Sequence, residues 1–113
     1  IVSNVTGKLR KNISIFETFL SGFPAGTVSG APKIRAMEII DELENSKRKV
    51  YAGGIGYFTS NQDFDTCIAL RTALIKNKKI YVQSGAGIVA DSNPENEYNE
   101  TVNKAKALLK AIN

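Results

Sequence analysis

The chain contains no histidine and no tryptophan, and it has one cysteine and three prolines among its 113 residues. Without histidine it lacks the usual general base near neutral pH and the commonest zinc ligand. The lone Cys67 cannot form an internal disulfide, and it lies in an apolar run that predicts a buried, unreactive thiol. The sequence therefore excludes a histidine base and a cysteine–histidine zinc site within this chain.

Long hydrophobic runs are also absent. No apolar stretch is long enough to cross a membrane, and the start shows no signal-peptide pattern. With 42% hydrophobic and 23% charged residues, the composition is typical of one soluble globular domain or less, and we expect a cytoplasmic protein.

The net charge of +4 is spread over short clusters at predicted turns, such as Lys47–Lys49. These clusters are not interleaved with aromatic residues, and the chain has no recognisable reading helix. We therefore interpret them as solvated turns and expect no nucleic-acid or membrane partner.

The first residue is Ile1, and the chain opens within an alternating pattern that predicts a strand over residues 1–9. A native start more often has a capped or disordered lead-in, so we expect a fragment of a longer polypeptide. An exposed sheet edge in such a fragment would favour self-association.

The helix signals are local. Ser14 can cap a short helix over residues 15–20, and Pro32 marks the first turn of a helix over residues 32–44. A last helix is expected from Pro94 to Ile112, with a serine or asparagine cap just before it.

Three β-strands are expected between these helices, over residues 51–59, 65–76 and 79–89. Their short connections predict an antiparallel meander. The order of elements predicts an α+β unit in which helices cover an antiparallel sheet.

The segment Phe23-Pro-Ala-Gly-Thr-Val-Ser-Gly-Ala-Pro-Lys33 stands out as a glycine- and proline-rich loop that runs into a helix. Its glycines allow close backbone approaches, and Thr27 and Ser29 supply hydroxyls. Lys33 lies near the positive end of the helix dipole, where a nearby anion would be favourable. A nucleotide-binding P-loop is excluded because the Gly-Lys-Ser/Thr ending is missing. An ordinary connection with a solvated lysine is the alternative.

Two carboxylates lie three residues apart on the last helix. Glu97 and Glu100, with Lys104 four residues further on, share one side of it. They could hold a hard cation such as Mg²⁺, although two glutamates make an incomplete site. Alternatively, Glu100 pairs with Lys104 and the row faces water.

Four further residues can carry chemistry. Gly85 and Gly87 interrupt a strand pattern, which indicates a bulge or a close approach to a ligand. Arg71 lies in a strand-forming run, where its guanidinium either grips a carboxylate or reaches solvent. Tyr51 precedes a glycine pair, and its phenol either offers a hydroxyl or packs.

Together these segments resemble the carboxy-terminal part of the catalytic subunit in the anthranilate synthase branch of the chorismate-utilising enzymes. The resemblance covers essentially the whole chain. The residues that carry it are 23–44, 51–58, Asp65 and Thr66 with Arg71, and 83–91, followed by Pro94, Glu95, Glu97, Tyr98 and Glu100. Ala25-Gly-Thr-Val-Ser-Gly30 looks like the anthranilate branch rather than the aminodeoxychorismate branch, which is the alternative together with a stand-alone ligand-binding module.

The resemblance implies half of an αββα sandwich and a reaction in which ammonia adds to the chorismate ring and pyruvate is eliminated. It also implies a glutamine amidotransferase subunit as partner. Thr27 would line the ring site, Tyr51 and Arg71 would hold the enolpyruvyl carboxylate, and the backbones of Gly85 and Gly87 would contact substrate. In the same way, Glu100 would bind Mg²⁺ with support from Glu97, and Lys104 would add positive charge.

The chain departs from this family pattern at its start. The family has an active-site histidine just before the segment that matches residues 1–3, and the upstream glutamates are also missing. The resemblance therefore implies that residues 1–113 are an incomplete catalytic domain that is inactive by itself. The role of Lys33 stays unassigned.

Overall fold

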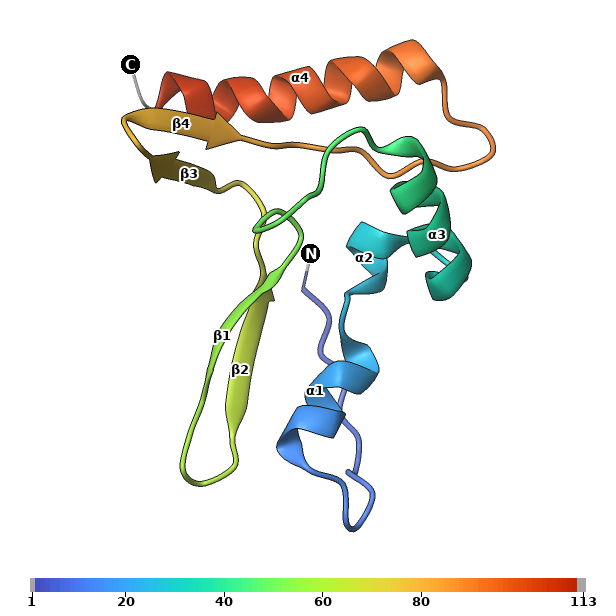
Figure 1. The fold of residues 1–113 in the computed structure, drawn as a ribbon. Coiled ribbons are helices and arrows are strands. Elements are labelled where there is room, and N and C mark those ends of the chain that lie inside the picture. The colour runs from blue at the N-terminus through green and yellow to red at the C-terminus, as the bar shows by residue number, and fades with distance from the viewer. Residues whose placement is uncertain (1, 112–113) are drawn as a thin grey trace.

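The computed structural model describes residues 2–111, and this part of the chain contains four helices and four strands (Figure 1). In chain order they are α1 (Ile15–Gly22), α2 (Gly26–Ser29), α3 (Lys33–Leu43), β1 (Gly54–Phe58), β2 (Phe64–Ile68), β3 (Ala73–Lys76), β4 (Lys79–Val82) and α4 (Pro94–Lys110). The α+β class with antiparallel strands is confirmed. The expected strand over residues 1–9 is wrong, because residues 2–10 form no regular element and are exposed.

Helix α1 begins as its sequence predicts. The Ser14 hydroxyl accepts a hydrogen bond from the Glu17 amide at 3.2 Å, and the Glu17 carboxylate accepts one from the Ser14 amide at 2.8 Å. This reciprocal capping box satisfies two amides that would otherwise lack partners in the first turn.

The glycine-rich loop differs from the expectation because it contains a helical turn, α2, between Gly26 and Ser29. Gly30 ends this turn with a φ of 95°, a left-handed angle that glycine adopts without a steric penalty. Pro32 is the N-cap of α3 and lies just before its first turn rather than within it.

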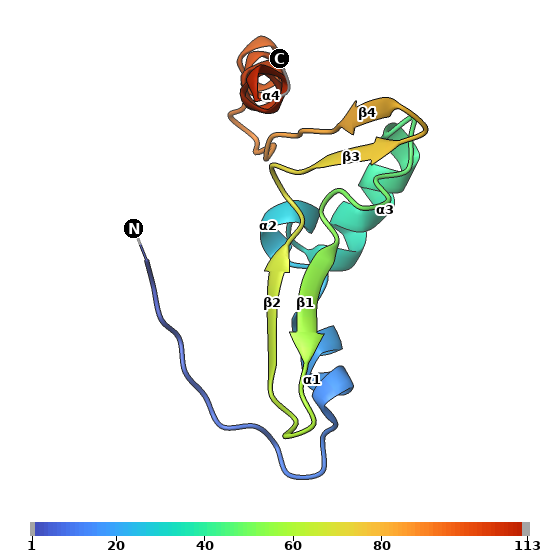
Figure 2. The same ribbon diagram turned by 90° about the vertical axis from the view of Figure 1, so that its left-hand side faces the viewer.

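The strands form two separate antiparallel hairpins, β1–β2 and β3–β4, instead of one meander (Figure 2). The run expected over residues 65–76 breaks after Ile68, since Arg71 has a φ of 54° and cannot continue a strand. The strand expected to reach residue 89 ends at Val82. Asn77 and Lys78 both have positive φ, as the tight turn between β3 and β4 requires.

Helix α4 is the longest element, and its cap was predicted correctly. The Asn93 side chain accepts hydrogen bonds from the amides of Glu95 and Asn96, and Pro94 occupies the first turn. The helix lies along β4 and the segment that follows it (Figure 1). Its expected end at Ile112 lies outside the described residues.

Very little of the described chain is buried. Ala52 and Ala69 are the only buried hydrophobic residues among residues 2–111, and Ser29 is the buried polar one. The radius of gyration is 16.8 Å, against about 13 Å for a compact domain of about 100 residues. Cys67, expected to be buried, is exposed because no element covers its face of the β1–β2 hairpin.

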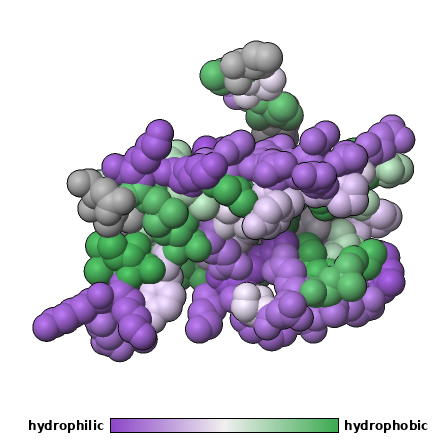
Figure 3. All heavy atoms as spheres, turned by 90° about the horizontal axis from the view of Figure 1, so that it is seen from above, coloured by the Kyte–Doolittle hydropathy of each residue, from purple (hydrophilic) through white to green (hydrophobic). Residues whose placement is uncertain are grey.

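The main apolar cluster joins α1 to the first hairpin. Phe19 contacts the rings of Phe23, Phe58 and Phe64, with centroids 5.1 to 6.2 Å apart. The Phe16 ring lies tilted against that of Phe58, with centroids 4.9 Å apart. Seen from above, a band of hydrophilic side chains crosses the molecule, and hydrophobic groups are exposed beside it (Figure 3). The apolar surface of this fold is thus only partly covered by its own elements.

Candidate functional site

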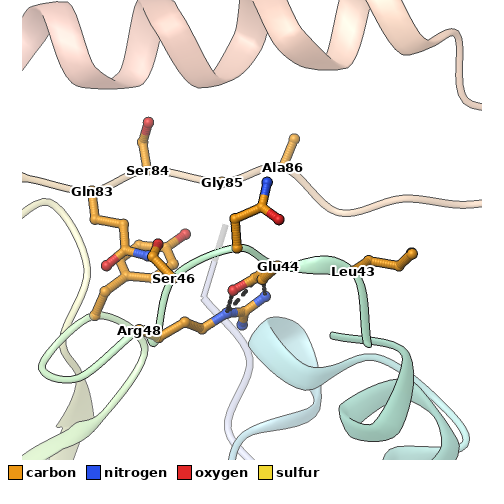
Figure 4. Close-up of a pocket in the computed structure, with 10 residues that line it drawn as sticks. Leu43, Glu44, Ser46, Arg48, Gln83, Ser84, Gly85 and Ala86 are labelled. Atoms are coloured by element: carbon orange, nitrogen blue, oxygen red, sulfur yellow. Dashed lines mark hydrogen bonds and ion pairs between the residues drawn. The ribbon is translucent and has the colours of Figure 1, made fainter. Parts of the chain in front are cut away.

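A pocket of about 440 Å³ lies between the connection from α3 to β1 and the segment that follows β4 (Figure 4). One wall comes from residues 43–51 and the other from residues 83–86. Its lining residues are Leu43, Glu44, Asn45, Ser46, Arg48, Tyr51, Gln83, Ser84, Gly85 and Ala86. Two residues expected from the sequence to bind substrate, Tyr51 and Gly85, therefore line the same pocket.

Tyr51 and Gly85 approach closely. A Cβ atom at Gly85 would lie 2.8 Å from the Tyr51 hydroxyl oxygen, which is closer than carbon and oxygen can approach without a shift. The glycine predicted to allow a close approach does so, although the group that approaches it here is the tyrosine phenol. The phenol thus ends at the backbone of the pocket's far wall.

Lys104 extends this arrangement to α4. Its ammonium donates a hydrogen bond to the Gly85 carbonyl at 3.0 Å and forms an ion pair with Glu100 one turn earlier on the helix. The neighbouring Ser84 hydroxyl donates to the Thr101 carbonyl at 2.8 Å. The 83–86 segment is therefore fixed to α4 at two successive residues, and the expected pairing of Glu100 with Lys104 is present.

Arg48 also lines this pocket, and sequence reasoning missed it because it was grouped with the solvated Lys47–Lys49 cluster. Its Nε donates to both carboxylate oxygens of Glu44 at 2.9 and 3.0 Å, and its Nη1 donates to the Val28 carbonyl at 2.8 Å. Hydrogen bonding to Glu44 raises the pKa of Arg48 above its ordinary value. The spacing of Glu44 four residues before Arg48 was a usable signal.

The other predicted site residues lie apart from this cluster. Thr27 is exposed on α2, and a Cβ at Gly87 would meet nothing within 4 Å. Arg71 lies in the bend between the hairpins, is exposed, and forms no ion pair with any residue in the 2–111 range. Its left-handed φ of 54° is a strained conformation for a residue with a long side chain, a feature that clusters at functional sites.

Glu97 and Glu100 lie on one side of α4, where Glu97 is half-buried and the Glu100 side chain is 51% exposed. Their carboxylate oxygens are donors of the kind that Mg²⁺ prefers. Among residues 2–111 no third histidine, cysteine, aspartate or glutamate joins them in a group that could hold a metal. Two glutamates alone do not make up a metal site in this part of the chain, and their role as magnesium ligands stays a prediction.

Lys33 has a structural partner rather than an anion. Its ammonium donates a hydrogen bond to the carbonyl of Gly22, the last residue of α1, at 3.3 Å. A cation is favourable at the negative end of a helix dipole, so Lys33 helps to terminate α1.

A smaller, mostly apolar pocket of about 210 Å³ lies on the other side of Arg48 and Tyr51. Phe23, Val28 and Met37 contribute to it from the helical half of the molecule. Both pockets share Arg48 and Tyr51 as lining residues. No helix within residues 2–111 is long and apolar enough to cross a membrane.

Comparison with known proteins points to one family. The sequence pattern of the family described as chorismate binding enzyme matches residues 1–110. Three curated relatives are named anthranilate synthase component 1. The protein of Cereibacter sphaeroides is 61% identical over 98% of this chain, that of Acetivibrio thermocellus is 59% identical over 99%, and that of Aquifex aeolicus is 58% identical over 99%. The matched region makes up 22%, 23% and 23% of these relatives, so the chain spans less than a quarter of their length.

Proposed function

Because the chain belongs to the family of chorismate-binding enzymes, we propose that it forms part of the catalytic subunit of an anthranilate synthase. In the proposed reaction, ammonia adds to the chorismate ring, and water and pyruvate leave to give anthranilate. One observation carries the proposal: a continuous series of contacts runs along one wall of the larger pocket. It leads from the Tyr51 hydroxyl to the Gly85 backbone, from there to Lys104, and from Lys104 to Glu100.

The charges of these residues suit a substrate with two carboxylates. The exposed Arg71 guanidinium has no carboxylate partner in the described part of the chain and would bind one substrate carboxylate. The metal proposed at Glu97 and Glu100 would take the second, and Lys104, although it pairs with Glu100, would add positive charge next to the pocket wall. A guanidinium can grip a carboxylate through two parallel hydrogen bonds. The Tyr51 hydroxyl and the backbone of Gly85 and Gly87 would then fix the orientation of the substrate, with Thr27 facing the ring.

Magnesium is part of this proposal. Glu97 and Glu100 would supply two of its ligands, and the remaining ligands would come from outside residues 2–111. When bound, the metal would offset the charge of a substrate carboxylate. Lys104 would orient the Glu100 carboxylate through their ion pair.

Aminodeoxychorismate synthesis is the rival enzymatic function, since it uses the same two substrates and retains the enolpyruvyl group. The names of the relatives favour the anthranilate reaction. A stand-alone chorismate-binding module is a further rival, but the proposed metal ligands Glu97 and Glu100 have no third ligand among residues 2–111, and so incomplete a site should bind chorismate weakly.

A glutamine amidotransferase subunit is the proposed source of ammonia, which the designation component 1 of the relatives supports. A cytoplasmic location is likewise part of the proposal.

The experiment that tests this function uses a chimeric subunit, in which this chain replaces the matching 111-residue segment of the Cereibacter sphaeroides component 1. With chorismate, ammonia and Mg²⁺, we expect anthranilate fluorescence to appear. Glu100→Ala in the chimera should abolish turnover at low Mg²⁺ while the circular dichroism spectrum stays unchanged. Glu95→Ala, which changes an exposed carboxylate on the first turn of the same helix, is the matched control. Normal turnover by Glu100→Ala would refute the metal role.

A further inference from the structure

The geometry points to Arg48, together with Glu44, as a positioning pair that holds the Tyr51 phenol and helix α2 in one fixed arrangement at the substrate pocket. This inference rests on the proposed function. It adds two residues that neither the sequence pattern nor the proposed mechanism includes.

The Arg48 side chain contacts three separate parts of the fold. It binds the Glu44 carboxylate through Nε and Nη2, and that carboxylate lies at the C-terminal end of α3. Its Nη1 reaches the Val28 carbonyl in α2, twenty residues away in the sequence and next to Thr27. Val28 is therefore tied directly to the connection between α3 and β1.

The third contact is with Tyr51. The Arg48 guanidinium carbon lies 5.9 Å from the centre of the Tyr51 ring, within range of a cation–π interaction. The backbone of the same two residues is joined by a hydrogen bond from the Tyr51 amide to the Arg48 carbonyl at 3.0 Å. Arg48 thus restrains the tyrosine at its backbone and at its ring, and the hydroxyl at the far end faces Gly85.

Arg48 already has partners for its charge and its nitrogens, so we infer that it positions other groups and does not itself bind the anionic substrate. Its guanidinium is half-buried, with the side chain 26% exposed, and all three of its nitrogens already donate to Glu44 or Val28. Glu44 neutralises its charge at close range. Arg71, by contrast, has no carboxylate partner in the described part of the chain.

Substitutions of Glu44 and Arg48 distinguish a positioning role of Arg48 from direct binding of the substrate anion. Glu44→Gln removes the neutralising charge but keeps the size of the side chain. If Arg48 were a direct anion ligand, this change would leave chorismate binding intact or tighten it. A positioning pair predicts the opposite, because the guanidinium loses its bidentate partner and the phenol shifts.

In the chimeric subunit, we expect Glu44→Gln to raise the KM for chorismate by on the order of tenfold, since small displacements of substrate-orienting groups are costly. Arg48→Lys should have a similar effect, because an ammonium keeps the charge but cannot bridge Glu44 and Val28 together. The matched control is the Arg35–Glu42 pair, joined at 3.0 Å on the exposed side of α3. Arg35→Lys and Glu42→Gln should change KM and kcat by less than about twofold.

A second measurement does not depend on activity. In the chimeric subunit labelled at tyrosine and glycine, we expect a nuclear Overhauser contact between the Tyr51 ring and the Gly85 α-protons. Arg48→Lys and Glu44→Gln should remove this contact, and Arg35→Lys should keep it. Tyr51→Phe assigns the ring signal.

Unchanged or lowered KM in Glu44→Gln would overturn the positioning role, as would full retention of the Tyr51–Gly85 contact in Arg48→Lys. Absence of that contact in the unsubstituted chimera would also overturn it. An inactive unsubstituted chimera would count against the proposed function alone, because the contact measurement still decides the role of Arg48.

Discussion

The ammonium of Lys104 and the carbonyl of Gly85 are joined by a 3.0 Å hydrogen bond that connects α4 to the pocket wall across nineteen residues of sequence. The same ammonium pairs with Glu100, so one side chain couples the proposed substrate contact to the proposed metal ligand. Any substitution that displaces the Lys104 ammonium should therefore affect both the proposed substrate contact and the proposed metal ligand.

Replacing Lys104 with methionine tests this coupling. Methionine keeps the aliphatic stem but loses the hydrogen bond and the ion pair, so we expect kcat/KM for chorismate to fall by about 10- to 100-fold, as for a lost hydrogen bond to a charged group. Steady-state kinetics of the chimeric subunit provides the measurement. Lys106→Met is the control, since Lys106 is exposed on the same helix. An effect of equal size in both variants would contradict the coupling.

The close approach of β2 to Gly56 in β1 can be tested by substitution. A Cβ at this position would overlap the Asp65 carbonyl oxygen and lie 2.9 Å from the Thr66 Cα, and neither backbone atom can move without breaking the strand pair. We expect Gly56→Ala to weaken the β1–β2 pairing by about 2 kcal/mol or more.

The measurement for this variant is amide hydrogen exchange of residues 54–58. Gly7→Ala is the matched control, because a Cβ there would meet nothing within 4 Å. Unchanged protection of β1 in Gly56→Ala would show that the close approach is not present in solution.

The capping box of α1 predicts a pH dependence. The hydrogen bond from the Ser14 amide, together with that of the Ser14 side chain, lowers the pKa of Glu17 below its ordinary value. A lowered carboxylate pKa means that the contribution to helix stability is complete above the ordinary glutamate pKa and is lost as the pH falls through the lowered value.

We therefore expect the first turn of α1 to loosen only in that acidic window. The chemical shift of the Ser14 amide should follow the titration of Glu17, and Ser14→Ala should raise its midpoint. Glu17→Gln keeps the capping geometry but should remove the titration. A midpoint that does not respond to Ser14→Ala would contradict the cap.

The 113-residue chain by itself should neither turn over chorismate nor stay monomeric. Large apolar side chains such as Leu43, Ile75 and Ile88 are more than 70% exposed, and exposed apolar patches of this kind favour association. We expect binding of a hydrophobic dye and a sedimentation coefficient above that of a monomer. A monomer without dye binding would contradict the expected association. Rapid formation of anthranilate by the chain alone would contradict the prediction that its site is incomplete.

Helices α1, α3 and α4 could be predicted from the sequence because their signals are local, whereas the short α2 within the glycine- and proline-rich loop was not predicted. Ser14 and Asn93 cap their own helices within three residues, so no tertiary information is needed. The expected site residues on α4 could likewise be placed on one face from their spacing alone.

The strand pattern and the role of Arg48 depend on distant contacts. The run from residue 65 to 76 is rich in strand-forming residues and has no glycine or proline to mark a break. Its break follows from the left-handed φ of Arg71 and from pairing of Ala69 with residues 52 and 53. Arg48 resembled its lysine neighbours in the sequence, yet its Val28 partner lies twenty residues away. The exposure of Cys67 also depends on what covers the hairpin, which its own sequence does not specify.

The most direct test of the account is the product balance of the unsubstituted chimeric subunit supplied with chorismate, ammonia and Mg²⁺. The account predicts anthranilate and pyruvate in equal amounts, measured by fluorescence and by a coupled lactate dehydrogenase assay. Consumption of chorismate to an amino product without release of pyruvate would contradict the anthranilate reaction and favour aminodeoxychorismate synthesis.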